Sequence, residues 1–214
     1  MEQELRRALT ARPRCELEAE AGRRAAVLVL IYPLAGEPAV LLTRRRSHLG
    51  RHPGEVSFPG GGCEAGDDGV AGAALREAHE EIGLDAGRVA VVGMLDDMPT
   101  LVSGMVVTPV VATAADLGKL HADPGEVAEI IEVPLRRLVD PNTFRRARLG
   151  PPGGYVTCLF DLGSVVVWGL TGRILDIFLE VAAPVLLGCE MPEPKMVEAE
   201  WQEGQPWPRI KRAR

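Results

Sequence analysis

The chain has 214 residues, 46% of them hydrophobic, and a formal net charge of −6 at pH 7. This length can bury a full hydrophobic core in one domain, and the acidic balance predicts no affinity for nucleic acid or for an anionic membrane surface. The cysteines, at positions 15, 63, 158 and 189, lack CxxC spacing and are expected to be free thiols. Together with the lack of a secretory signal pattern, they predict an intracellular protein, in the cytoplasm or in an organelle.

A mixed α/β organisation is expected from the order of the hydrophobic runs. Residues 1–23 are expected to form a helical or irregular extension, and the main helices are expected at residues 69–82 and from Thr171 onward. Strands are expected at residues 25–31, 39–43, 56–58, 89–95, 105–113, 130–133, 155–160 and 165–168. The longest apolar stretch, residues 174–187, contains acids and a proline, so it does not predict a membrane span. The segment 190–214 is rich in Pro, Glu, Lys and Arg and is expected to be disordered or loosely docked.

The helix expected at residues 69–82 has clear end signals. Asp68 is a suitable N-cap, Gly83 suits the left-handed residue that ends a helix, and Leu84 can pack back beneath it. The apolar positions that define its inner side are Val70, Ala74, Ala78 and Ile82. The opposite side of the helix is therefore expected to face outward.

Carboxylates gather on this outer side. Glu77, Glu80 and Glu81 occupy positions i, i+3 and i+4, where a like-charged pair costs roughly 0.2–0.5 kcal/mol. A hard divalent cation would turn that repulsion into attraction, because such ions prefer oxygen ligands. Arg76, four residues before Glu80, can hold its carboxylate. An acidic helix face is more often simply solvated, but the glycines at 60–62 let a backbone approach a ligand closely, and the combination predicts a metal–phosphate site.

This loop and helix resemble the box of the Nudix hydrolases, G-x5-E-x7-R-E-U-x-E-E-x-G-U, where U is bulky and aliphatic. The matching positions are Gly62, Asp68, Arg76, Glu77, Ala78, Glu80, Glu81, Gly83 and Leu84. Asp68 stands where Glu is usual, and Ala78 is smaller than the usual first U. The resemblance implies an α/β fold of the Nudix type, an α/β/α sandwich with a mixed sheet, and places the Nudix hydrolase domain at residues 24–189.

A second, narrower resemblance lies upstream of the box. Residues 41–61, LLTRRRSHLGRHPGEVSFPGG, are similar to an element of coenzyme A pyrophosphatases that runs roughly LLTxRSxxLRxHxGxxxFPGG. The chain departs from that element at Arg46, where a small residue is usual, and at Gly50, where arginine is usual. Further similarity to the same subfamily lies at residues 107–111, 126–135 and 167–175.

The Nudix resemblance implies metal-dependent hydrolysis of a pyrophosphate. Glu77 and Glu81 would bind Mg²⁺ or Mn²⁺, with Glu80 as a third ligand or as the base that orients water. Arg76 would hold the glutamates, and the backbone of Gly61 and Gly62 would shape the loop around metal and substrate. Further acids that could contribute to the site are Asp68, Asp96, Asp97, Glu126 and Glu129.

Substrate choice is predicted from a basic stretch, residues 44–52, which holds four arginines and two histidines and no acid. Arginine forks suit phosphate oxygens, so Arg45, Arg51 and His52 are expected to bind the phosphates of coenzyme A. A solvated edge strand guarded by charge is the competing interpretation. The expected function is hydrolysis of coenzyme A or acyl-CoA to 3′,5′-ADP and (acyl-)4′-phosphopantetheine. The alternatives are a Nudix pyrophosphatase for ADP-ribose or a nucleoside triphosphate, and a non-catalytic Nudix-fold binding module.

Overall fold

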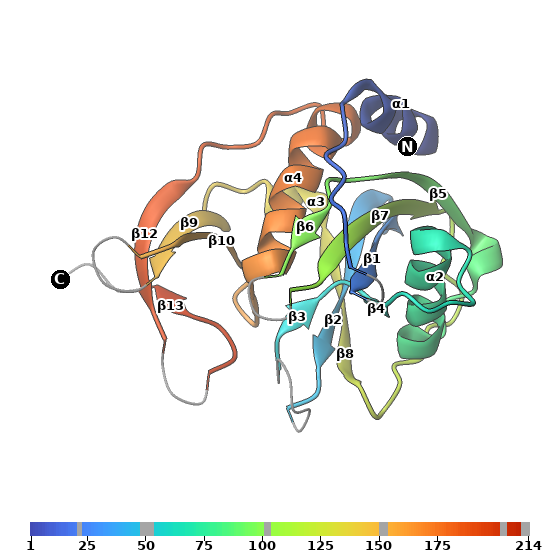
Figure 1. Ribbon diagram of the computed structural model, residues 1–214. Helices are drawn as coiled ribbons and strands as arrows, with labels where there is room; N and C mark the ends of the chain where they lie inside the picture. The colour runs from blue at the N-terminus through green and yellow to red at the C-terminus, as the bar shows by residue number, and fades with distance from the viewer. Residues whose placement is uncertain (21–22, 48–53, 101–103, 150–153, 202–204, 211–214) are drawn as a thin grey trace.

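The computed structural model describes residues 1–20, 23–47, 54–100, 104–149, 154–201 and 205–210, which form two β-sheets with helices around them (Figure 1). The helices are α1 (Glu2–Ala11), α2 (Gly69–Ile82), α3 (Leu135–Leu138) and α4 (Gly169–Leu186), with a 3-10 turn, η1 (Ala86–Arg88). The strands of the larger sheet are β1 (Arg24–Leu34), β2 (Glu37–Arg45), β3 (Val56–Ser57), β4 (Gly60–Gly62), β5 (Val89–Met94), β6 (Met98–Pro99), β7 (Val106–Ala114) and β8 (Val127–Pro134). The smaller sheet comprises β9 (Phe144–Leu149), β10 (Val156–Asp161), β11 (Val166–Trp168), β12 (Lys195–Glu200) and β13 (Arg209–Ile210).

The larger sheet is mixed. Its central order is β3-β2-β1-β7-β5, and β4 pairs with β1, β6 with β7, and β8 with β2. β1 and β7 run parallel, in a register from Arg24↔Val106 to Ile31↔Thr113, whereas the other described pairs of this sheet are antiparallel. A parallel pair needs a crossover connection, and the chain between β1 and β7 contains α2. The parallel pair therefore brings α2 back onto the sheet.

Helices cover both faces of the larger sheet, as strand β1 shows. Leu28 and Leu30 belong to the apolar cluster that includes Ala78 of α2, whereas Val29 and Ile31 belong to the cluster that contains the inner side of α4. A strand buried on both faces has a continuous rather than an alternating hydrophobic run. This arrangement confirms the expected α/β/α sandwich (Figure 1).

The two main helices differ in how well the sequence predicts their starts. The helix expected over residues 69–82 is confirmed as α2, although Asp68 holds the N-cap position without a capping hydrogen bond from its side chain. The final helix is not capped by Thr171, since α4 already starts at Gly169. The N–H of Gly169 instead donates to the hydroxyl of Thr157 at 3.2 Å. A residue of strand β10 thus accepts the hydrogen bond of the first helical N–H, and a capping rule based on local sequence does not predict such a partner.

The N-terminal extension is part of the packed structure. Helix α1 buries Leu5 and Leu9 in the cluster shared with α4, and it also contacts β5. After this helix, Arg14 forms an ion pair with Asp97 at 2.7 Å. Residue 24 therefore marks where the family resemblance starts, and the packed structure starts earlier. None of the helices in the described part of the chain is long and apolar enough to cross a membrane.

The described part of the segment 190–214, which was expected to be disordered or loosely docked, contains two short strands. β12 pairs in parallel with β9, from Lys195↔Arg145 to Ala199↔Leu149, and β13 pairs with β12. Successive side chains of a strand point to opposite faces. Along β12 the apolar Val197 and Ala199 pack inward, while Glu198 between them and the flanking Met196 and Glu200 are exposed. The overall composition of the segment does not record the order of its residues, so it does not predict this strand.

Candidate active site

Helix α2 places its glutamates in different environments. Gly83 ends the helix with a φ of 68°, and the fully buried Leu84 follows it. In this register Ile82 faces the sheet. Glu81 is turned into the protein and is only 5% exposed, whereas the side chain of Glu80 is 56% exposed. The acids therefore do not share one solvated face, as the sequence had suggested, because one of them is buried.

Arg76 ties the acidic helix to the preceding loop. Its Nη1 atom lies 3.1 Å from Oε1 of Glu77 and 3.2 Å from Oε2 of Glu80. Its Nη2 donates to the carbonyl of Gly62 at 2.9 Å, and its Nε donates to Oδ1 of Asp67 at 2.8 Å. The guanidinium is thus fixed by Asp67 and in turn orients two glutamates.

Sequence reasoning misses Asp67. Two adjacent acids precede α2, and the capping rule selects Asp68. In the structure it is Asp67 that pairs, and hydrogen bonds from Arg76 and from the N–H of Glu64 lower its pKa. A single sequence holds no spacing rule that distinguishes the two acids, because the pairing depends on how the loop folds back onto the helix.

The glycine strand β4 approaches the inner glutamates. It pairs antiparallel with the start of β1, and the N–H of Gly60 donates to Glu81. A Cβ atom at Gly61 would lie 2.4 Å from Oε1 of Glu77, so a side chain there would displace that carboxylate. At Gly62 a Cβ atom would meet nothing within 4 Å. Glycine at position 61 therefore lets Glu77 lie against the loop, whereas Gly62 contributes its backbone carbonyl to Arg76.

Glu81 has the most perturbed pKa of these acids. Burial raises the pKa of Glu81 to about 8, partly opposed by Arg45 and by a backbone N–H, while Glu126 and Glu77 add repulsion. Burial also raises the pKa of Glu77. The Oε2 atom of Glu81 is buried and finds no hydrogen-bond partner among the described residues. Such an oxygen is costly to bury unless a cation joins it.

These donors fit a hard divalent cation. Within the described residues, no three acid, histidine or cysteine side chains already stand close enough together to hold an ion, and Glu77 and Glu80 face Arg76 instead. The fit rests on oxygen-only donors, on the unpartnered oxygen of Glu81 and on the close approach of the Glu77 carboxylate to Gly61. Glu77, Glu80 and Glu81 are thus the residues that would hold Mg²⁺ or Mn²⁺.

Asp96 and Asp97 are occupied by the N-terminal segment. Asp97 accepts hydrogen bonds from Arg24 at 2.8 Å and from the hydroxyl of Thr108 at 2.7 Å, besides its ion pair with Arg14. Burial alone would raise the pKa of Asp97, but these hydrogen bonds outweigh it and lower the pKa to about 2. Asp96 pairs with Arg12. Both acids therefore fasten residues 12–17 to the domain.

The other acids that the sequence named as possible contributors differ in their distance from the candidate site. Glu129 forms an ion pair with Arg44 at 2.7 Å, which is an ordinary surface contact. Glu126 is close enough to Glu81 to raise its pKa. Asp68 makes no capping hydrogen bond. Of the acids outside the box helix that the sequence left open, Glu126 is the one whose charge acts on the site.

The basic stretch reaches the glutamates through Arg45. Its Nη1 atom lies 3.9 Å from Oε1 of Glu81. The N–H of Arg46 donates to the carbonyl of Glu126 at 2.9 Å, which fixes the neighbouring backbone. Two further predicted substrate residues, Arg51 and His52, lie outside the described residues.

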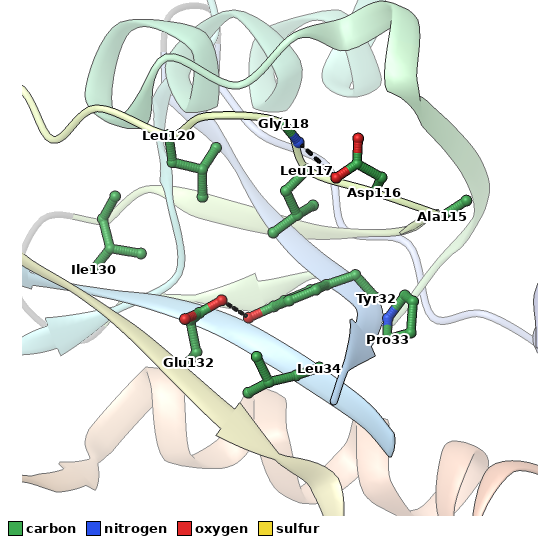
Figure 2. A pocket seen from close by; sticks show the side chains of 10 residues that line it. All are labelled: Tyr32, Pro33, Leu34, Ala115, Asp116, Leu117, Gly118, Leu120, Ile130 and Glu132. Carbon is green, nitrogen blue, oxygen red and sulfur yellow. Dashed lines mark hydrogen bonds between the residues drawn. The ribbon is translucent and has the colours of Figure 1, made fainter. Parts of the chain in front are cut away.

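A pocket of about 420 Å³ lies between the end of β1, strand β8 and the loop after β7 (Figure 2). Leu117 and Ile130 are among its apolar walls, and the hydroxyl of Tyr32 donates to Glu132 across it at 2.7 Å. Its lining includes none of the box glutamates and none of the glycine strand. Its acidic lining residues, Asp116 and Glu132, would repel a phosphate. The pocket is therefore separate from the glutamates of α2 and is not taken as the candidate site.

Comparison with known proteins gives consistent matches. Residues 22–152 match the family model of the NUDIX domain. The mitochondrial coenzyme A diphosphatase NUDT8 of Mus musculus is 39% identical over 165 residues, covering 75% of this chain and 78% of that protein. The Nudix hydrolase NudL of Enterobacter sp. (strain 638) is 35% identical over 167 residues, covering 77% and 85%. The solved NUDIX hydrolase of Alicyclobacillus acidocaldarius aligns at a TM-score of 0.50 and 18% identity, covering 82% of this chain and 100% of that one.

The region matched by the family model contains the glycine strand, Arg76 and the glutamates of α2. It spans more than half of the chain, and the relatives at 35–39% identity extend beyond it. The structural alignment supports the same fold. This chain belongs to the Nudix hydrolase family, whose members are pyrophosphohydrolases of small nucleotide derivatives.

Proposed function

We propose that the chain hydrolyses the pyrophosphate bond of coenzyme A or an acyl-CoA with Mg²⁺ or Mn²⁺, giving 3′,5′-ADP and (acyl-)4′-phosphopantetheine. The observation that carries this proposal is the approach of Arg45 to Glu81, 3.9 Å between Nη1 and Oε1. It joins the upstream element, which resembles that of coenzyme A pyrophosphatases, to the buried glutamate of the box. The 39% identity to a protein named as a coenzyme A diphosphatase supports the same substrate.

The proposed roles of the site residues follow from how deeply each side chain is buried. A bound divalent cation would neutralise phosphoryl charge and lower the pKa of water. Glu77 and Glu81, which border the glycine strand, are the proposed ligands. Glu80 is the most exposed of the three, and it is proposed to act as a third ligand or to accept the proton of water. Arg76 keeps the carboxylates oriented, and Arg45 can receive a phosphate oxygen beside Glu81.

A second substrate class has one observation in its favour. Arg46 and Gly50 depart from the coenzyme A pattern, which favours another nucleoside diphosphate derivative such as ADP-ribose, or a nucleoside triphosphate. A non-catalytic binding module has no such support. Such a module has no use for a buried carboxylate whose oxygen lacks a partner.

Direct comparison of substrates tests the proposal. Hydrolysis of coenzyme A, acetyl-CoA, ADP-ribose and nucleoside triphosphates would be measured with Mg²⁺ and with Mn²⁺, and the products identified by mass. We expect the highest kcat/KM on coenzyme A or its acyl form, with 3′,5′-ADP as one product. A higher kcat/KM on ADP-ribose or on a triphosphate would instead assign the second substrate class. Glu81→Gln serves as the control for a contaminating hydrolase.

A further inference from the structure

The chain beyond β12 is fastened beside β11 by aromatic residues and prolines. The ring of Trp201 meets that of Trp168 edge-on, with centroids 4.7 Å apart and planes at 77°. The indole N–H of Trp168 donates to the carbonyl of Pro206 at 3.2 Å. Trp207 packs against the main apolar core, and Pro208 is buried. The carbonyl and ring of Pro206 are therefore held in a fixed place next to the larger sheet.

Pro206 meets the larger sheet at Gly54. A Cβ atom on Gly54 would lie 3.2 Å from Cγ of Pro206, and the φ of +72° at this residue also favours glycine. The next residue, Glu55, accepts the N–H of Arg45 through its carbonyl at 2.9 Å. Pro206 thus lies beside Gly54, and the residue after Gly54 is hydrogen-bonded to Arg45 at the end of β2.

We infer that residues 195–201 and 205–210 form a positioning element for Arg45, with Pro206 as the residue through which they act. The inference rests on the proposed function, because Arg45 is the proposed phosphate-binding residue that the element would hold in place through Gly54 and Glu55. It extends that function to a segment outside the family match, which ends at residue 152.

The hydrolytic part of the site is fixed independently of Pro206. β4 pairs with β1, Phe58 is buried, and the N–H of Leu28 donates to the carbonyl of Pro59 at 2.8 Å. Arg76 holds the glutamates from the other side. Loss of the Pro206 contact should therefore weaken substrate binding and leave the hydrolytic step intact.

The test uses two substitutions that break different halves of the contact in the full chain. Pro206→Gly removes the ring that meets Gly54, and Trp168→Phe removes the N–H donor while keeping an aromatic ring beside Trp201. Each should raise KM for coenzyme A about three- to tenfold, with kcat within about twofold of wild type. The matched control is Glu198→Ala, an exposed residue of the same segment whose side chain pairs only with Arg148, at 3.9 Å, among the described residues. Its KM should not change.

An unchanged KM in both variants would overturn the inference, as would a fall in kcat with KM unchanged. Amide hydrogen exchange at Arg45, measured without substrate, gives a readout that does not depend on activity. Exchange there should be faster in Pro206→Gly than in wild type or Glu198→Ala, and equal protection would also overturn the inference.

Failure of the proposed function is distinguishable from failure of this inference. If the wild-type protein hydrolyses ADP-ribose and not coenzyme A, the substrate assignment fails, and KM is then compared on ADP-ribose. The exchange measurement at Arg45 is unaffected by that result. The point substitutions are preferred to truncation after Cys189, because truncation removes β12 from its pairing with β9 and threatens folding.

Discussion

Glu81 and Asp97 are both 5% exposed, yet their surroundings differ in kind. Both oxygens of Asp97 accept hydrogen bonds, and its pKa is lowered to about 2. In Glu81 the Oε2 atom has no partner among the described residues, and its pKa is raised to about 8. The fold thus satisfies one buried acid completely and leaves the other short of positive charge.

The difference teaches how a structural acid is told from a functional one. Burial is equal at the two positions, so burial does not separate them. The number of donors does, because an acid that serves the fold has its partners within the chain. An acid left short of partners is a candidate for binding a group from outside the chain.

Glu81→Gln should have the largest effect on activity. Loss of a carboxylate at the proposed metal site should lower kcat by about a hundredfold or more, measured at saturating Mg²⁺ with coenzyme A. Near wild-type turnover would remove Glu81 from the site.

The same variant should not lose stability in the absence of metal. The folded-state pKa of Glu81 lies above its ordinary value of 4.5, so the wild-type protein is penalised as pH rises from about 5 to about 8. Glutamine does not ionise and should escape this penalty. Thermal unfolding with a chelator present, at pH 6 and pH 9, checks this sign; a variant less stable than wild type at pH 9 would contradict it.

Asp97→Asn should show the opposite pattern, with a loss of stability and little loss of activity per folded molecule. Removing one partner of a buried ion pair costs roughly 3–5 kcal/mol, and we expect about 2–3 here because Arg14 and Arg24 keep access to solvent. The folded-state pKa of about 2 lies below the ordinary 3.8, so the wild-type advantage is full above about pH 4 and is lost as pH falls towards 2. Urea unfolding across this pH range measures it.

Gly61→Ala should reduce activity by about ten- to a hundredfold with little change in stability. The added methyl group would lie 2.4 Å from Oε1 of Glu77. That carboxylate is the end of a flexible side chain, so it can move away, but it then loses its place at the site. Gly62→Ala is the matched control, because a methyl group there meets nothing within 4 Å. Equal activity in the two variants would show that Glu77 has no fixed place.

Arg45→Ala should raise KM for coenzyme A by about tenfold, since a charged hydrogen bond to phosphate is worth roughly 1.5–3 kcal/mol. Arg44→Ala is its control, because Arg44 pairs with Glu129 and not with the box. A larger rise for coenzyme A than for dephospho-coenzyme A would assign Arg45 to the 3′-phosphate. Equal rises would assign it to the pyrophosphate, and no rise would return the basic stretch to a solvated edge.

The sequence predicted the fold well where structure is local. The limits of α2 follow from its periodicity and from Gly83, and β10 and β11 lie close to the strands expected at residues 155–160 and 165–168. The start of α4 was wrong because its donor is met by Thr157 from another strand. The strand β12 was not expected, because it becomes a strand only by pairing with β9. Both errors come from partners that are distant in the sequence.

For the candidate site, spacing alone selected helix α2 but did not predict the environment of its acids. A pattern of i, i+3 and i+4 places Glu80 and Glu81 on neighbouring positions, and only the packing of α2 against the sheet shows that Glu81 is buried. The sequence does not single out Asp67 for a related reason, since its pairing with Arg76 depends on the path of the loop. The motif names the proposed ligands, whereas tertiary structure sets their charge state.

The packing of α1 has a consequence for synthesis of the protein. Its apolar residues Leu5 and Leu9 are buried with α4, a helix that leaves the ribosome only after residue 169 has been made. Until then α1 has only its contact with β5 of the larger sheet. Chains fold from the N-terminus as domains complete, so the burial of α1 is completed only once α4 has been made.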